Sequence, residues 1–199
     1  LGVPWSVSAH AKDVWTTPEW EIREKLAACA WLVTCTACNA AYLRTLAAPQ
    51  TPVELLYHGI DLQAFPAPPI HGLSFSRRDG SDPSDPVRLL SIGRAVEKKG
   101  YDILLRALAA LPASVCWRLV HIGGGPLLKP LKRMAHTLGL AERIEWRGPL
   151  SHDDVLCAYR QADIFVLACR IAADGDRDGL PNVLMEALSQ RLPCISTAV

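Results

Sequence analysis

The sequence has no excess of charge of either sign. Its 199 residues carry 21 Lys and Arg against 20 Asp and Glu, and the formal net charge is +1. Proteins that bind nucleic acid through its phosphates carry a clear basic excess, so we expect no nucleic-acid partner. Half of the residues are hydrophobic and 21% are charged. This composition excludes a disordered chain and predicts a globular protein with a sizeable core.

Long hydrophobic runs are also missing. The longest stretch without a charged residue is 26–43, and it contains the polar residues Thr34, Thr36 and Asn39. A membrane-spanning helix needs about 20 mostly apolar residues, so we expect none. The opening residues lack the basic segment and apolar core of a secretory signal. The chain starts at Leu1 and stops within the apolar pattern 193–199, which predicts a fragment of a longer protein.

The cysteines form neither a disulfide framework nor a zinc motif. There are seven, whereas disulfide-stapled secreted domains are usually shorter and have an even number. Cys35 and Cys38 match C-x-x-C, but no second pair of ligands follows at a spacing typical of zinc sites. A redox role for this pair is a weak alternative, since it lies at the end of a threonine-rich strand. We expect buried, reduced cysteines that pack as small hydrophobes.

The order of predicted elements indicates two α/β halves joined by a linker. Pro, Ser, Asp and Gly concentrate in 66–86, a composition typical of loops. We place the linker at 76–86, the first half at 1–75 and the second at 87–199. In the first half we predict strands at 5–9, 31–36 and 53–59, and helices at 18–30 and 39–47.

Strands and helices alternate strictly after the linker. Strands with little polar alternation, separated by helices, predict a parallel sheet covered on both faces, as in a doubly wound α/β domain. Ligands of such domains bind at the carboxyl ends of the strands. The predicted strands are 87–93, 116–123, 143–148, 163–169 and 193–199, and the predicted helices are 100–111, 127–139, 151–162 and 180–190. Ser151 is the expected N-cap of its helix, and Pro130 suits a first turn.

The first loop after a predicted strand carries Gly93, Arg94 and Lys99. Gly93 permits a sharp turn, so the two basic side chains lie near the start of the next helix. A helix N-terminus beside Arg and Lys favours a bound phosphate group. The alternative is a solvated charge cluster in which Glu97 neutralises one lysine, and this loop taken alone favours that alternative.

The second loop contains three successive glycines at 123–125. A dinucleotide-binding G-x-G-x-x-G would need glycine at position 128, which is Leu128. No acidic residue follows at the distance that binds a ribose. A nicotinamide-dependent oxidoreductase is therefore disfavoured, and the glycines serve a tight turn that lets a ligand approach.

The third loop, 174–186, is the most informative. Gly179 and Pro181 fit a turn that opens a helix, whose free N–H groups suit a diphosphate. Glu186, about one turn into that helix, can accept two hydrogen bonds from a vicinal diol such as a ribose. Asp178 can reach a sugar hydroxyl. The alternation of acidic residues here also suggests a calcium loop, but its twelfth position is Met185, so we expect no metal ion.

Four segments together resemble one known family. They are GRAVEKKG at 93–100, IGGGPL at 122–127, the unit at 143–169 and DGLPNVLMEA at 178–187. In this order and spacing they resemble the family 4 retaining glycosyltransferases of the GT-B fold, in particular those of bacterial exopolysaccharide and colanic-acid-type pathways. YHGIDLQAF at 57–65 is similar to the turn between the family's two domains, and SAHAKD at 8–13 to its acceptor-domain loop.

The resemblance implies an α/β fold with two incomplete, doubly wound Rossmann-like domains. Residues 1–75 would be the trailing part of the N-terminal acceptor domain, and 87–199 most of the nucleotide-sugar domain. It also implies a cytoplasmic enzyme, with peripheral contact at the inner face of the membrane as a further expectation. The fragment itself is expected to be inactive.

The resemblance also implies residue roles. Arg94 and Lys99 match the basic pair that neutralises the donor diphosphate. Asp178 and Glu186 match the E-x7-E acids, which bind the transferred sugar and the ribose; Asp178 stands where the family usually has Glu. His10 matches the cleft histidine near the anomeric carbon, although the residues alone favour a turn-capping histidine. Further donor contacts are implied for Gly93, Pro149, Leu150, Gly179, Leu180, Pro181, Asn182 and Val183.

The expected reaction is retaining hexosyl transfer from a UDP- or GDP-sugar to a glycan or lipid-linked acceptor. No cofactor or metal is expected. Because no carboxylate nucleophile is evident, front-side attack is expected, with the leaving phosphate taking the acceptor proton. Two alternatives stay open: a GT-B phosphorylase or sugar-phosphate synthase, and a non-catalytic module that binds nucleotide sugars.

Overall fold

The structure is a computed structural model that describes residues 2–68 and 78–198. It comprises two compact units. The first consists of Leu1–Gly59 with Ile171–Pro181, and the second of Ile60–Arg170 with Asn182–Ala198. The predicted linker at 76–86 and the domain bounds on either side of it stay predictions, because 69–77 lie outside the described residues.

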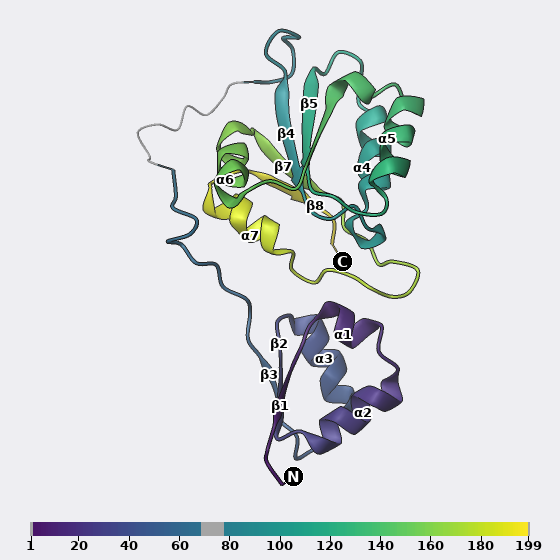
Figure 1. The fold of residues 1–199 in the computed structure, drawn as a ribbon, viewed down its shortest axis with the longest axis vertical. Coiled ribbons are helices and arrows are strands. Elements are labelled where there is room, and N and C mark those ends of the chain that lie inside the picture. The colour runs from purple at the N-terminus through teal and green to yellow at the C-terminus, as the bar shows by residue number, and fades with distance from the viewer. Residues whose placement is uncertain (1, 69–77, 199) are drawn as a thin grey trace. The chain divides into compact units, whose positions relative to one another are not determined.

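The second unit is built on a five-stranded parallel sheet (Figure 1). Its strand order is β6-β5-β4-β7-β8. The order reverses between β4 and β7, which are hydrogen-bonded neighbours, and doubly wound folds bind ligands at this reversal point. The strands are β4 (Val87–Ile92), β5 (Trp117–Ile122), β6 (Ile144–Gly148), β7 (Ile164–Leu167) and β8 (Cys194–Ser196).

Helices cover both faces of this sheet, as the sequence predicts. Figure 1 shows α4 and α5 on one face and α6 and α7 on the other. The helices are α4 (Tyr101–Ala109), α5 (Leu128–Thr137), α6 (His152–Gln161) and α7 (Asn182–Ser189), with short 3-10 turns η2 (Glu97–Lys99) and η3 (Ala141–Arg143). α7 begins two residues later than predicted.

Sequence features explain why these helices form where they do. Tyr101, Leu104, Leu105 and Leu108 are buried on α4, and their helical spacing places them on one core-facing side. Ser151 caps α6 by accepting a hydrogen bond from the backbone N–H of Asp154 at 3.3 Å, as predicted. Pro130, also as predicted, lies in the first turn of α5, where its missing N–H costs no hydrogen bond.

The first unit has a three-stranded parallel sheet in the order β1-β2-β3. The strands are β1 (Ser6–Ala9), β2 (Trp31–Thr34) and β3 (Val53–Leu55), and the helices are α1 (Ala11–Trp15), α2 (Glu19–Ala28) and α3 (Ala37–Leu46). α1 is not among the predicted elements, because a single helical turn shows no apolar period. The strand predicted at 53–59 is shorter than expected, since pairing of β3 with β2 ends at Leu55.

The cysteines only partly follow the expectation. Cys29, Cys35 and Cys169 are buried, but Cys38 and Cys157 are exposed. The two exposed thiols sit on the outer sides of α3 and α6, so an apolar neighbourhood in sequence does not place them in the core. Within the described residues all cysteines are free thiols. No helix in the described part of the chain is long and apolar enough to span a membrane.

Candidate functional site

In the second unit, the loops at the carboxyl ends of β4, β5 and β6 are hydrogen-bonded to one another. The N–H of Ala95 donates to the carbonyl of Gly124 at 2.8 Å, and the N–H of Leu127 donates to that of Ala95 at 3.0 Å. The N–H of Gly123 donates to the carbonyl of Gly148 at 2.8 Å. The sheet edge therefore carries a continuous rim of backbone.

Close backbone approach explains the glycines of the second loop. Gly123 has φ +136°, and a Cβ there would overlap the carbonyl of Gly93. Gly125 has φ +145°, and its Cβ would lie 2.7 Å from the backbone of Ala95. The expected tight turn is present, and its tightness comes from packing against the first loop.

The predicted basic pair extends from this rim. Arg94 is exposed, and Lys99 is half-buried at the end of η2. A Cβ on Gly93 would lie 3.4 Å from Cε of Lys99, so the lysine chain passes directly beside this glycine. The structure therefore brings together Gly93 and Lys99 in the loop that follows β4.

Arg170, which is not among the predicted site residues, holds this loop in place. Its backbone N–H donates to the carbonyl of Lys98 at 2.9 Å. Its guanidinium lies 3.1 Å from Asp102 and 3.5 Å from Glu97. The segment after β7 thus anchors the segment after β4. The sequence feature that marks this residue is an arginine directly after a predicted apolar strand.

Glu186 is held by a buried tyrosine. The hydroxyl of Tyr159, on α6, lies 2.8 Å from Oε2 of Glu186 and 3.2 Å from the carbonyl of Val183. Burial and the neighbouring carboxylate raise the pKa of Tyr159 above its ordinary value, so the phenol stays protonated and donates. Glu186 is half-buried. Glu186 is among the predicted site residues, and Tyr159 is not.

Pro149 and Leu150 lie where β6 ends. Pro149 is exposed, and its Cγ would lie 3.7 Å from a Cβ on Gly124. Leu150 packs against the core of the second unit. Both residues thus adjoin the rim, within reach of the second loop.

The loop 171–181 packs within the first unit. The guanidinium of Arg177 lies 4.0 Å from the centre of the Trp15 ring, a cation–π contact. A Cβ on Gly179 would lie 2.5 Å from Cγ2 of Thr36. The carboxylate of Asp174 accepts a hydrogen bond from the N–H of Asp176 at 3.0 Å, so it caps its own turn.

The predicted site residues divide between the two units. Those in the first unit are His10, Asp178, Gly179, Leu180 and Pro181. Those in the second are Gly93, Arg94, Lys99, Pro149, Leu150, Asn182, Val183 and Glu186. Their assembly into one site stays a prediction.

His10 makes more contacts than a turn-capping histidine needs. It is the N-cap of α1, and its N–H donates to Oδ2 of Asp13 at 3.0 Å. Its ring nitrogens lie 3.2 Å from Oγ of Ser8 and 3.5 Å from Sγ of Cys35. The ring centre of His58 is 5.0 Å away. His10, Cys35 and His58 could together hold a metal ion. Among the described residues, they form the one group of three or more His, Cys, Asp or Glu side chains whose ligand atoms are close enough to share such an ion.

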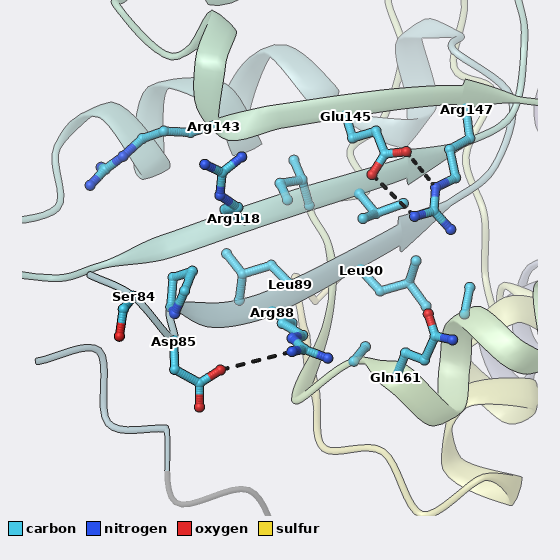
Figure 2. Close-up of a pocket in the computed structure, with 15 residues that line it drawn as sticks. Ser84, Asp85, Arg88, Leu89, Leu90, Arg118, Arg143, Glu145, Arg147 and Gln161 are labelled. Atoms are coloured by element: carbon cyan, nitrogen blue, oxygen red, sulfur yellow. Dashed lines mark hydrogen bonds and ion pairs between the residues drawn. The ribbon is translucent and has the colours of Figure 1, made fainter. Parts of the chain in front are cut away.

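A cavity of about 340 Å³ lies elsewhere in the second unit. It lies over β4, β5 and β6, and Figure 2 shows Arg118 and Arg143 nearer the start of the strands than Arg147. Glu145 and Arg147 pair through two contacts of 2.8 and 3.1 Å; the hydrogen bond from Arg147 lowers the pKa of Glu145. None of the predicted site residues lines this cavity.

Comparison with known proteins identifies the family. Residues 74–199 match the family model described as "Glycosyl transferases group 1". The chain belongs to this family. The predicted resemblance is confirmed, and the rim, the basic pair and Glu186 all lie in the part of this glycosyltransferase chain that matches the family model.

Curated relatives of this glycosyltransferase chain include enzymes that use sugar nucleotides. It is 31% identical over 152 residues to a GDP-mannose-dependent alpha-(1-6)-phosphatidylinositol monomannoside mannosyltransferase of Mycobacterium tuberculosis, covering 74% of this chain and 38% of the relative. It is 28% identical over 159 residues to the putative colanic acid biosynthesis glycosyltransferase WcaL of Escherichia coli, covering 79% and 37%. The chain therefore spans about two fifths of these relatives.

Solved structures show the same fold. The Anabaena protein Alr3699/HepE in complex with UDP aligns with a TM-score of 0.72 at 15% identity, covering 95% of this chain and 52% of that one. The sucrose-phosphate synthase of Thermosynechococcus elongatus aligns with a TM-score of 0.71 at 21% identity, covering 91% and 44%. These likenesses confirm the predicted α/β fold of the GT-B glycosyltransferases.

Proposed function

We propose that this chain is part of a retaining glycosyltransferase that needs no metal ion for the transfer. It would move a hexosyl group from a UDP- or GDP-sugar to a glycan or lipid-linked acceptor. The observation that carries the proposal is the placement of Arg94 and Lys99 after β4 and of Glu186 on α7 after β7. β4 and β7 are neighbours at the reversal of strand order, where doubly wound sheets bind nucleotides.

Each side chain has a role suited to its chemistry. Arg94 and Lys99 neutralise the diphosphate, because cationic donors match phosphate oxygens. Glu186, oriented by Tyr159, accepts hydrogen bonds from the ribose diol. Asp178 contacts the transferred sugar. The backbone of 179–183 binds phosphate and sugar, and that of Pro149 and Leu150 contacts the base.

The proposed chemistry is front-side attack. The glycosidic bond to the diphosphate breaks as the acceptor oxygen approaches the same face, and the leaving phosphate takes the acceptor proton. His10 lies near the anomeric carbon in this proposal. Negative charge develops on the diphosphate, so the basic pair stabilises the transition state more than the ground state.

The activities named for two relatives support the substrate classes. One mannosyltransferase is described as GDP-mannose-dependent and as acting on a phosphatidylinositol monomannoside, which favours a nucleotide-sugar donor and a lipid-linked acceptor. In this proposal, residues 1–75 belong to the acceptor domain, 76–86 form the linker and 87–199 belong to the donor domain. The proposal also places the enzyme in the cytoplasm, in peripheral contact with the inner face of the membrane.

A melting-temperature panel tests the proposal. UDP, GDP, NAD and inorganic phosphate would each be added at about one hundred times a plausible Kd, where a ligand of the folded state adds about 2.7 kcal/mol. For a domain of this size, that corresponds to a rise of about 5–10 °C. We expect a rise with UDP or GDP alone, and the effective nucleotide identifies the base.

A matched pair of variants assigns the shift to the proposed site. Arg94→Ala should reduce the rise with nucleotide. Arg118→Ala, an exposed arginine of the cavity on the sheet face, should leave it unchanged. A rise with phosphate alone would favour a phosphorylase, and no rise with any ligand would contradict a nucleotide site. Nucleotide binding without slow donor hydrolysis in the full-length protein would favour a binding module.

A further inference from the structure

Three metal-ligating side chains meet at one edge of the small sheet. His10 directly follows β1, Cys35 directly follows β2, and His58 comes three residues after β3. In the register of this sheet Thr34 pairs with Ala9 on one side and with Leu55 on the other. The carboxyl ends of the three parallel strands are therefore level, and the three side chains that follow them lie together.

Two of the three ligand atoms are spaced as in a tetrahedral zinc site. One atom from each of the three residues lies within 4.8 Å of the other two. Nδ1 of His10 is 3.5 Å from Sγ of Cys35. Zinc–sulfur and zinc–nitrogen bonds of about 2.3 and 2.0 Å at a tetrahedral angle separate the two ligand atoms by about 3.5 Å.

The surroundings orient the first ligand. Nε2 of His10 lies 3.2 Å from Oγ of Ser8, so Nδ1 is the nitrogen that faces the sulfur. Metal-binding histidines commonly use their second nitrogen in this way, which fixes the ring. The backbone N–H of His10 also bonds to Asp13 at 3.0 Å, which holds the residue at the start of α1.

We propose that His10, Cys35 and His58 bind a zinc ion. One sulfur and two imidazole nitrogens match the ligands that Zn²⁺ takes in proteins, whereas calcium and magnesium prefer oxygen. Three protein ligands leave the fourth position to water or another small ligand. For this cluster the proposal replaces the expectation of no metal site; it does not involve zinc in the transfer reaction.

Zinc binding changes the state of Cys35. A zinc ion deprotonates a coordinating thiol, and binding therefore releases one proton to solvent. Bound zinc also occupies Nδ1 of His10. If the proposed function holds, zinc also inhibits transfer, because Nδ1 of His10 is then bound to the metal.

Cobalt titration tests the site without any sugar transfer. Co²⁺ replaces Zn²⁺ in such sites, and a cobalt–thiolate bond gives a charge-transfer band in the near ultraviolet. We expect one Co²⁺ per chain, with this band, displaced by added Zn²⁺. Cys35→Ser should lose the band, and His58→Gln should weaken Zn²⁺ binding by at least about tenfold.

The chain provides a matched control in Cys38. It is an exposed cysteine on α3, three residues from Cys35, and Cys38→Ser should bind metal like the parent. Far-ultraviolet circular dichroism checks that each variant folds. The proposal is overturned if the parent shows no cobalt–thiolate band, if Cys35→Ser keeps it, or if Cys38→Ser loses it. The melting panel with nucleotides is independent of this result.

Discussion

The hydroxyl of Tyr159 lies 2.8 Å from Oε2 of Glu186 and links α6 to α7 at the proposed ribose position. Removing this hydroxyl leaves a half-buried carboxylate without its donor. A hydrogen bond to a charged group contributes about 1.5–3 kcal/mol.

Tyr159→Phe should therefore lower the free energy of unfolding by about 1.5–3 kcal/mol. It should also weaken binding of UDP or GDP by about tenfold, because Glu186 loses its orientation. Urea unfolding and calorimetric titration measure the two effects. Tyr42→Phe removes a hydroxyl from a ring that stacks on Trp15, and it should leave nucleotide affinity unchanged. Equal affinities for Tyr159→Phe and the parent would rule out this positioning role.

The basic pair predicts a second effect on nucleotide affinity. Arg94→Ala and Lys99→Ala should each weaken binding of the nucleotide diphosphate by about 10–100-fold, since each removes a charge-assisted contact. The nucleoside without phosphates should bind each variant and the parent alike. Calorimetry with UDP or GDP and with the matching nucleoside measures this difference. Arg118→Ala is the control. Unchanged nucleotide affinity in both Arg94→Ala and Lys99→Ala would contradict the proposed neutralisation of the diphosphate by the basic pair.

A third prediction concerns Gly100, which precedes α4 with φ +60°. An added Cβ would overlap the carbonyl oxygen of Ala168 at the end of β7. Gly100→Ala combines left-handed backbone strain with this overlap, and we expect a loss of about 3 kcal/mol or more in the free energy of unfolding.

Gly139→Ala is the matched control for that variant. Gly139 has φ +73°, and an added Cβ there meets nothing within 4 Å. It should cost only the backbone strain, about 1–2 kcal/mol. Urea denaturation of the two variants measures the difference. Equal losses in Gly100→Ala and Gly139→Ala would mean that close packing of the loop after β4 against the end of β7 does not contribute to the free energy of unfolding.

His121 predicts how stability depends on pH. This histidine of β5 is buried between the rings of Tyr101 and Trp146. Neither of its ring nitrogens has a hydrogen-bond partner within the described residues. Burial lowers the pKa of His121 from 6.5 to about 4. Between these values the unfolded chain binds the proton and the folded chain does not, so acid favours unfolding.

The free energy of unfolding should therefore be unaffected by His121 above pH 6.5 and fall by about 3 kcal/mol as the pH drops to 4. In His121→Phe this contribution should be absent, so its curve falls less steeply than that of the parent. His136→Gln changes an exposed histidine of α5 and should keep the parent slope. Urea unfolding at several pH values gives the curves; parallel curves for His121→Phe and the parent would contradict the buried, neutral state.

Much of the fold follows from local sequence pattern. Alternating apolar strands and helices predict the parallel sheet of the second unit, and Ser151 and Pro130 mark helix starts correctly. The positions of Arg94 after one strand and of Glu186 on the helix after another follow from that alternation, because parallel strands end at one edge. Local pattern fails for α1, whose single turn has no apolar period, and for Cys38 and Cys157, whose exposure depends on helix orientation.

The sequence by itself determined the order of the strands and of the longer helices, the family resemblance and the polar residues that follow each strand. All of these depend on neighbours along the chain. Only the tertiary structure decided which of those residues meet: Tyr159 with Glu186, Arg170 with the loop after β4, and His10 with Cys35 and His58. Such pairs join residues 25 or more positions apart, and the register of the sheets and the packing of helices against them set these contacts.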